Sequence, residues 1–248
     1  MDQNVNNPKK TVEDYYLGSP LSIAEKILFI KRETRLAEYK EYLTDIHEFG
    51  HIWRGLTGTL AGEQVTLIAT GIGPSLVGDA VYVIDKPGAR CLYSGTCGGI
   101  SKDLEIGDYF LADQAICADG YSILFGQDFL SIVNSDEKLI LSLGSSFERI
   151  KLPFSVGLTY TTSSVVREND SDFWEFVSSK CQTIEMGCAS FYIAALRSQK
   201  QAAAYFWVTD LPTRGKSFLD AYSAEEIEIM QSRYQRGVSI DIQILSSI

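Results

Sequence analysis

The sequence is short of several features that particular protein classes require. It has only two histidines, His47 and His51, no CxxC pair among its five cysteines, and no run of 18 uncharged apolar residues. Most zinc sites and the Ser–His–Asp hydrolases depend on histidine, and a membrane-spanning helix needs about 20 apolar residues. We therefore expect no metal, no organic cofactor and no membrane partner. Catalysis should rest on carboxylates, hydroxyls and backbone amides.

Positive charge is also scarce, because 22 Lys and Arg face 32 Asp and Glu, a formal net charge of −10. Binding to nucleic acid needs clustered cations, so we expect no nucleic-acid partner.

The first residues, MDQNVNNPKK, have no apolar segment behind their lysines. With an odd number of cysteines, this start predicts reduced thiols and a cytoplasmic location.

The pattern along the chain predicts a polar segment at 1–13 and a single domain at 14–248. Ser22–Leu43 has apolar residues at helical spacing, which predicts one or two amphipathic helices. Short apolar runs that end at glycine or a small polar residue predict strands at Val65–Ala69, Ala89–Tyr93, Tyr109–Ala118 and Ala202–Thr209. Further helices are predicted at Leu76–Ile84, Asp172–Ser178, Ala189–Arg197 and Ala224–Ser247. This alternation is typical of an α/β fold, whose ligands bind beyond the carboxyl ends of the strands.

Two glycine-rich turns follow predicted strands. Gly71-Ile72-Gly73 lacks the third glycine of a dinucleotide fingerprint, because Leu76 stands there. It is either a tight strand-to-helix turn or a close approach of backbone to ligand. Ser94–Gly99 (SGTCGG) combines three glycines with two hydroxyl residues, which favours a ligand-contacting loop over a simple connection.

Two acidic residues stand in apolar surroundings. Asp210 ends an almost wholly apolar run, where burial raises the pKa of a carboxyl and suits it to general-acid chemistry. The alternative is a capping or turn-forming role. Glu185 in Thr183–Gly187 is equally open to a role as the cap of the helix that follows. His51, beside Phe49 and Trp53, is expected to be partly buried and structural.

Six motifs, in this order, resemble the nucleoside phosphorylases, a family that includes the hexameric purine nucleoside and uridine phosphorylases and the methylthioadenosine/adenosylhomocysteine nucleosidases. The motifs are Gly18-Ser19-Pro20, Leu56–Thr59 leading into Thr70–Ser75, Gly95–Gly99 with Ile106–Asp108, Asp119-Gly120, Glu185-Met186 and Val208–Asp210. The resemblance implies an α/β domain with a mixed, mostly parallel, partly barrel-like sheet flanked by helices. It also implies a small nucleoside-like ligand and a homo-oligomer, a dimer or a hexamer, with Phe49, His51 and Trp53 at an interface.

The resemblance further implies cleavage of the bond between a base and C1′ of a ribose. Asp210 matches the acid that protonates a purine leaving group, and Thr96 matches the hydroxyl that contacts the nucleophile and the sugar. Met186 matches the residue packed against the ribose, and Tyr160–Val166 the wall of the base pocket. The substrate contacts it implies are Gly18, His51, Gly71, Tyr93, Gly95, Thr162, Val165, Glu185, Met186 and Gly187.

Four positions depart from the family. Ser22, His51 and Tyr93 stand where the phosphorylases have phosphate-binding arginines, and such arginines clamp phosphate bidentately. Gly187 replaces the glutamate that binds the ribose hydroxyls. On this alignment the acidic balance of the chain extends into the site, so we expect a neutral substrate and hydrolysis rather than phosphorolysis.

Two other functions stay open. The chain could be a phosphorylase whose anion site has been rebuilt from Arg54, Arg167 or Arg214. It could also be a non-catalytic or repurposed descendant of the fold, because a fold does not determine a function.

Overall fold

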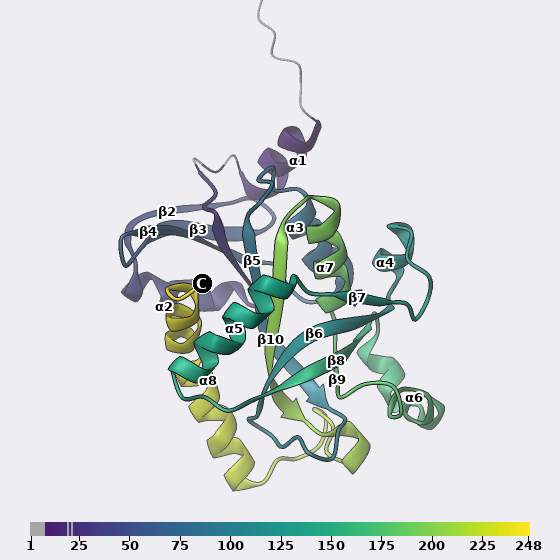
Figure 1. Ribbon diagram of the computed structural model, residues 1–248. Coiled ribbons are helices and arrows are strands. Elements are labelled where there is room, and N and C mark those ends of the chain that lie inside the picture. The colour runs from purple at the N-terminus through teal and green to yellow at the C-terminus, as the bar shows by residue number, and fades with distance from the viewer. Residues whose placement is uncertain (1–7, 19, 21) are drawn as a thin grey trace, which may run out of the picture.

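The strands form one mixed sheet that closes partly into a barrel. The computed structural model describes residues 8–18, 20 and 22–248 (Figure 1). Among them the strand order is β10-β6-β8-β9-β5-β1-β4-β3-β2, with β7 beside β6, and β10 also pairs with β5, which closes a ring of five strands. The bounds are β1 (Lys26–Ile30), β2 (Thr44–Gly50), β3 (Arg54–Leu60), β4 (Glu63–Ala69), β5 (Arg90–Gly99), β6 (Tyr109–Ala118), β7 (Ile132–Asn134), β8 (Phe154–Thr162), β9 (Thr183–Glu185) and β10 (Gln201–Asp210).

The pairings confirm the expected mixed, partly barrel-like sheet of a single α/β domain. Strand β5 runs parallel to both β1 and β10, and β8 runs parallel to β6 and β9. Antiparallel pairings, such as β10 with β6 and β3 with β4, are as frequent as parallel ones among the described strands. The expectation that the sheet is mostly parallel is therefore wrong, because the hairpins β2–β3 and β3–β4 and the pairings of β6 with β7 and β10 and of β5 with β9 are antiparallel. Strands β1, β5 and β10 therefore present their carboxyl ends at the same edge.

Helices cover both faces of the sheet. They are α1 (Pro8–Leu17), α2 (Leu36–Tyr39), α3 (Pro74–Tyr82), α4 (Gly120–Leu124), α5 (Glu137–Arg149), α6 (Ser171–Val177), α7 (Cys188–Arg197) and α8 (Ala224–Leu245). Figure 1 shows α3 beside α7 on one face and α5 with α8 on the other. Tyr93 packs in the cluster that contains Phe191 of α7, whereas Tyr205 packs in the cluster that contains Ile244 of α8. Alternate residues of β5 and β10 thus face two different compartments.

Most of the predicted elements are present. The predicted strands correspond to β4, β5, β6 and β10, and the predicted helices to α3, α6, α7 and α8, with ends shifted by a few residues. Helix α1 begins at Pro8, inside the segment 1–13. The amphipathic helix prediction for Ser22–Leu43 is wrong over its first half, because Lys26–Ile30 forms β1, whose five residues are buried between β4 and β5.

The glycine-rich segment Ser94–Gly99 is part of strand β5 and not a loop. Gly98 and Gly99 pair with Ile184 and Thr183 of β9, at the place where the barrel closes. A Cβ atom on Gly99 would lie 2.9 Å from Cδ2 of Leu211. The glycines are therefore explained by close strand packing at this corner.

Two helical glycines give a matched pair of stability predictions. A Cβ on Gly78 of α3 would lie 2.5 Å from the ring of Tyr121, which is itself stacked on Phe125. Gly78→Ala should therefore lower the free energy of unfolding by about 1–3 kcal/mol through overpacking. A Cβ on Gly144 of α5 meets nothing closer than the Phe154 ring, at 3.6 Å. Gly144→Ala should raise the free energy of unfolding by about 0.5–1 kcal/mol, because alanine favours a helix.

Urea unfolding followed by circular dichroism measures both changes. A Gly78→Ala variant as stable as Gly144→Ala would contradict the packing assigned to Tyr121.

Candidate active site

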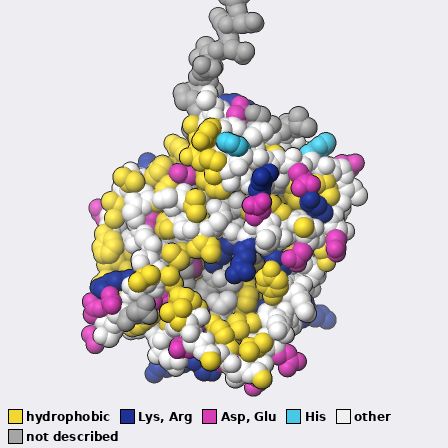
Figure 2. Space-filling view, turned by 180° about the vertical axis from the view of Figure 1, so that it is seen from behind, with side chains coloured by type: hydrophobic (Ala, Val, Ile, Leu, Met, Phe, Trp, Pro, Cys, Tyr) yellow, Lys and Arg dark blue, Asp and Glu magenta, His cyan; other side chains and the backbone are white. Residues whose placement is uncertain are grey.

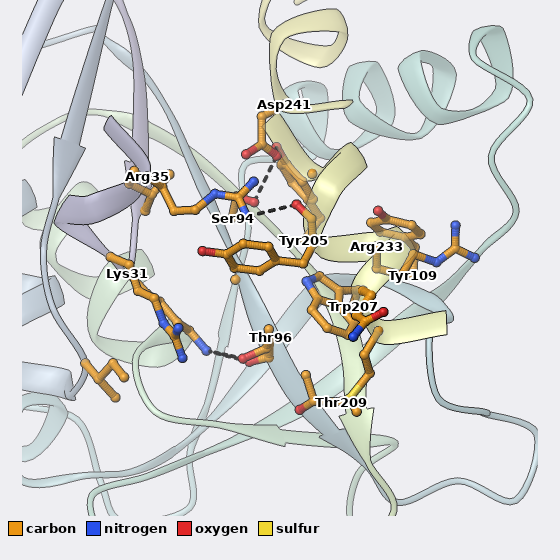
Figure 3. A pocket seen from close by; sticks show the side chains of 18 of the residues that line it. Lys31, Arg35, Ser94, Thr96, Tyr109, Tyr205, Trp207, Thr209, Arg233 and Asp241 are labelled. Atoms are coloured by element: carbon orange, nitrogen blue, oxygen red, sulfur yellow. Dashed lines mark hydrogen bonds between the residues drawn. The ribbon is translucent and has the colours of Figure 1, made fainter. Parts of the chain in front are cut away.

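A cavity of about 520 Å³ opens after the end of β1, beside the middle of β5 and the second half of β10, and continues beneath α8 (Figure 3). Strand β5 contributes Ser94, Gly95 and Thr96, and β10 contributes Tyr205, Trp207 and Thr209. Two of the predicted site residues, Gly95 and Thr96, therefore line the same cavity. The rest of the wall comes from the segment after β1 and from α8.

Lys31 is the residue that most changes the chemistry of this cavity. It follows β1 directly, and its Nζ atom donates hydrogen bonds to the carbonyl oxygen of Thr96 (2.6 Å) and to Thr96 Oγ1 (3.0 Å). Its side chain lies across Gly95, where a Cβ would be 2.6 Å from Lys31 Cε. Burial lowers the pKa of Lys31, and the nearby carboxyls of Glu185 and Asp210 oppose this shift. Lys31 Nζ thus lies beside the middle of β5, at Thr96.

Asp210 ends β10, directly after the cavity-lining Thr209. Its side chain is buried, with 5% of the residue exposed, and Oδ1 accepts a hydrogen bond from Thr209 Oγ1 at 2.8 Å. Burial raises the pKa of Asp210 above its ordinary value. Burial and the charge of Asp210 raise the pKa of Glu168 to about 7. A proton is therefore held more readily here than on an exposed carboxyl, as a general acid requires.

Glu185 serves as the cap of α7. Its buried carboxylate accepts hydrogen bonds from the backbone N–H groups of Gly187 (2.5 Å) and Cys188 (2.9 Å) and from Thr161 Oγ1 (2.5 Å). These contacts confirm the capping interpretation, because they satisfy N–H groups at the start of the helix. Burial raises the pKa of Glu185 to about 7 despite these donors.

The raised pKa of Glu185 predicts a pH-dependent stability. Between its ordinary pKa near 4.5 and its folded value near 7, the folded state binds more protons than the unfolded state. The free energy of unfolding should therefore fall across this interval, by an amount on the order of 2–3 kcal/mol, and level off above it. Glu185→Gln, which mimics the protonated acid, should lose this component.

Urea unfolding of both proteins at several pH values from 4.5 to 8.5 tests this. A stability difference between them that is constant across the range would contradict the shift.

Two departures from the family pattern lie against each other on the other face of β5. Tyr93 is 1% exposed and packs on Phe191 (ring centroids 5.4 Å apart) and Phe206 (5.5 Å). A Cβ on Gly187 would lie 3.1 Å from the Tyr93 hydroxyl and 2.9 Å from Val77. The small residue at 187 therefore leaves room for the tyrosine, so the two positions are complementary in volume.

Four other predicted contact residues do not line this cavity. Gly71, with φ +83°, precedes α3, and its neighbour Ile72 lines the cavity. Met186 is half-buried just before α7. Thr162 ends β8 and its Oγ1 donates to the carbonyl of Ser164 at 3.3 Å. Val165 begins the following 3₁₀ turn.

Gly18 and His51 do not line the cavity. Gly18 follows α1 and packs against the backbone of Gly50, and Ser19 of its motif lies outside the described residues. His51 is exposed, with Nδ1 2.9 Å from the carbonyl oxygen of Tyr15, so the expectation that it is partly buried is wrong. Trp53, in contrast, is 4% exposed and stacks on Tyr16, within the chain's own core.

The expectation that the acidic balance extends into the site is wrong. Lys31, Arg32, Arg35 and Arg233 line the cavity, and Asp241 is the only carboxylate among the lining residues. Figure 2 shows Lys and Arg side chains gathered over a hollow of the surface. Lys31 and Arg32 directly follow Lys26–Ile30, and Arg35 lies three residues further on. Recognising Lys26–Ile30 as a strand would therefore have placed Lys31 and Arg32 at the strand end.

The arginines considered as replacements are engaged elsewhere. Their ion-pair partners are Glu33 for Arg54 (3.7 Å), Asp172 for Arg167 (2.9 Å) and Glu105 for Arg214 (2.8 Å). Ser22 is exposed, and its carbonyl oxygen accepts a hydrogen bond from Thr57. None of these four residues lines the cavity.

Residues 8–18, 20 and 22–248 contain no group of three or more His, Cys, Asp or Glu side chains that could hold a metal ion. Within the same residues, every helix is too short or too polar to cross a membrane.

Comparisons with known proteins agree with this architecture. The family model of the phosphorylase superfamily matches residues 27–236. A DeoD-type purine nucleoside phosphorylase of Brevibacillus brevis is 31% identical over 160 residues, which cover 63% of this chain and 67% of that protein. Its counterpart in Clostridium beijerinckii is 27% identical over 236 residues, 92% of each chain. The uridine phosphorylase of Vibrio fischeri in complex with 6-hydroxy-1-naphthoic acid superposes with a TM-score of 0.77 at 13% identity and covers 92% of this chain and 93% of its own.

The match to the family model spans most of the sheet and both glycine-rich segments. The chain therefore belongs to the phosphorylase superfamily, as a divergent member.

Proposed function

We propose that the protein cleaves the N-glycosidic bond of a nucleoside by phosphorolysis. The observation that carries the proposal is the contact of Lys31 Nζ with Thr96 on β5. The buried acid Asp210 follows the cavity-lining Thr209, and its charge acts on the pKa of Lys31. Curated relatives such as those of B. brevis and C. beijerinckii are named purine nucleoside phosphorylases, which supports this reaction class.

Each of the three residues has one task in the proposed reaction. Lys31 and the Thr96 hydroxyl hold the phosphate dianion, because charge-assisted donors bind phosphate oxygens strongly. A phosphate oxygen forms a bond to C1′ as the bond from C1′ to the base nitrogen breaks. Asp210 gives its proton to the departing base, so the products are a free base and a ribose 1-phosphate. Phosphate beneath the sugar also stabilises the cationic character that develops on it.

Hydrolysis was the expectation from sequence, and its premise was a site without cations. Lys31 removes that premise, because it lines the cavity and contacts Thr96, the residue matched to the hydroxyl that contacts the nucleophile. A water nucleophile and a non-catalytic binding role are therefore kept as outcomes of the test.

The test is release of free base from a panel of purine and pyrimidine nucleosides, with and without inorganic phosphate, with identification of the sugar product. Phosphate-dependent release with formation of ribose 1-phosphate would support the proposal. Release at the same rate without phosphate, giving free ribose, would replace it with hydrolysis. Stabilisation by a nucleoside in a thermal shift without any turnover would favour the binding role.

We also propose that the chain acts as a homo-oligomer, a dimer or a hexamer. The exposed face around His51, Ile52 and Tyr15 supports this, because apolar and aromatic side chains gather there at the surface. Sedimentation velocity would detect it, and a monomer at micromolar concentration would contradict it.

A further inference from the structure

The cavity has a second part that the proposed reaction does not use. Beyond Thr96 and Thr209 it continues between the sheet and α8, where Tyr109, Tyr205 and Trp207 line it (Figure 3). Tyr234 of α8 also lines this part. We call this part, together with Arg35, Arg233 and Asp241, the aromatic lobe. It lies on the α8 side of β5 and β10, whereas Tyr93 and Gly187 lie on the α7 side.

The one carboxylate in the aromatic lobe, that of Asp241, already accepts hydrogen bonds from protein hydroxyls. Asp241 is buried and accepts hydrogen bonds from the hydroxyls of Tyr205 (2.6 Å), Ser94 (3.0 Å) and Tyr39. These donors come from β10, β5 and α2, so the network ties α8 to the sheet. Burial raises the pKa of Asp241. The carboxylate is therefore directed at protein hydroxyls and is not a free anion facing the cavity.

Arg35 and Arg233 line the aromatic lobe, and each has N–H donors that its hydrogen bonds to the protein do not use. The Arg35 guanidinium lies 4.0 Å from the Tyr234 ring centroid, donates to the Tyr234 carbonyl oxygen at 2.8 Å and pairs with Glu38. Arg233 lies 5.1 Å from the Tyr109 ring centroid and donates through Nε to the Gly107 carbonyl oxygen at 2.7 Å. These bonds use a minority of the five N–H donors that each guanidinium carries. Each arginine is thus held in place while it can still bind a ligand.

The charge and shape of the lobe point to one class of ligand. The chain has a net charge of −10, yet four of the five charged residues that line the cavity are basic. Flat aromatic faces favour a planar ring, and fixed guanidinium groups favour a carboxylate or phosphate attached to it. We propose that the aromatic lobe is a binding subsite for a planar aromatic group that carries negative charge.

Such a group has two possible sources. It can be a substituent on the nucleoside that is cleaved, because the lobe is continuous with the space at Thr96. It can also be a separate small molecule that binds beside the nucleoside. The proposal concerns binding alone, so it does not depend on turnover.

The test is isothermal titration calorimetry of the full chain with 2-naphthoate and with 2-naphthamide, which has a similar shape and no charge. We expect 2-naphthoate to bind at least tenfold more tightly than the amide. Trp207→Leu and Tyr234→Ala should each weaken naphthoate binding at least tenfold. Tyr234 is partly exposed on a helix, so its variant should fold even where the substitution at Trp207 does not. Arg149→Gln, an exposed arginine outside the cavity, is the matched control and should bind like the wild type.

Two further titrations separate the sources. Adenosine 5′-(phenyl phosphate) should bind at least tenfold more tightly than adenosine and displace 2-naphthoate if the group belongs to the substrate. If the group is a separate molecule, adenosine and 2-naphthoate should bind together without weakening each other. Equal binding of naphthoate and naphthamide, no binding of either, or tight binding that survives both lobe substitutions would overturn the proposal.

Discussion

Replacing Asp210 with asparagine is expected to lower kcat/KM for the best-cleaved nucleoside by about 10²–10⁴-fold, the usual contribution of a general acid. The amide keeps the size of the side chain and its contact with Thr209 but has no acidic proton to give to the leaving base. The binding of the nucleoside should change little, so the loss should appear in kcat. Initial rates of base release at saturating phosphate measure it.

The same substitution has a signature in the pH profile. Burial raises the pKa of Asp210, and only the protonated acid can donate, so activity should fall as the pH rises through that pKa. In Asp210→Asn this fall should disappear from the remaining activity. Asp128→Asn, at an exposed position outside the cavity, is the matched control and should behave as the wild type. An Asp210→Asn variant with wild-type kcat would remove this residue from the mechanism.

Replacing Lys31 with methionine is expected to raise KM for phosphate by about 10–100-fold, because a hydrogen bond to a charged group contributes about 1.5–3 kcal/mol. Methionine keeps an unbranched chain over Gly95 and removes only the ammonium that reaches Thr96. KM for the nucleoside should stay within about threefold. Steady-state kinetics with each substrate varied in turn separate the two constants.

Lys102→Met is the matched control for this prediction, since Lys102 is exposed and outside the cavity. Lys31→Arg should retain part of the phosphate affinity, because the positive charge is kept. An increase confined to the KM of the nucleoside would show that Lys31 acts on the sugar or base instead of the anion.

Much of the fold follows from local sequence patterns. Tyr109–Ala118 forms β6 with the predicted bounds, and the run that ends at Asp210 forms β10, because long apolar runs followed by a polar break specify buried strands. The helix prediction for the segment around β1 failed because only four uncharged residues, Ile27–Ile30, separate the charged residues on either side. A run of that length fits a helix face as well as a strand, and its partners β4 and β5 follow much later in the chain.

The candidate site, like the fold, was predicted from the sequence only in part. Sequence placed Thr96 and Asp210 at the ends of two strands, and register then puts Asp210 opposite Gly98 on the neighbouring strand. Lys31 was missed because its contact with Thr96 joins positions 65 residues apart. The hydrogen bonds to Asp241 join residues that are up to 202 positions apart in the sequence, so no local motif could have predicted them.

The sequence by itself determined the α/β class, the motifs of the phosphorylase superfamily and the positions of Thr96 and Asp210, because each depends on neighbouring residues. Only the tertiary structure decided the charge of the cavity. A net charge of −10 is a sum over the whole surface, whereas Lys31, Arg35 and Arg233 meet in one place through the pairing of β1 with β5 and the packing of α8 against the sheet.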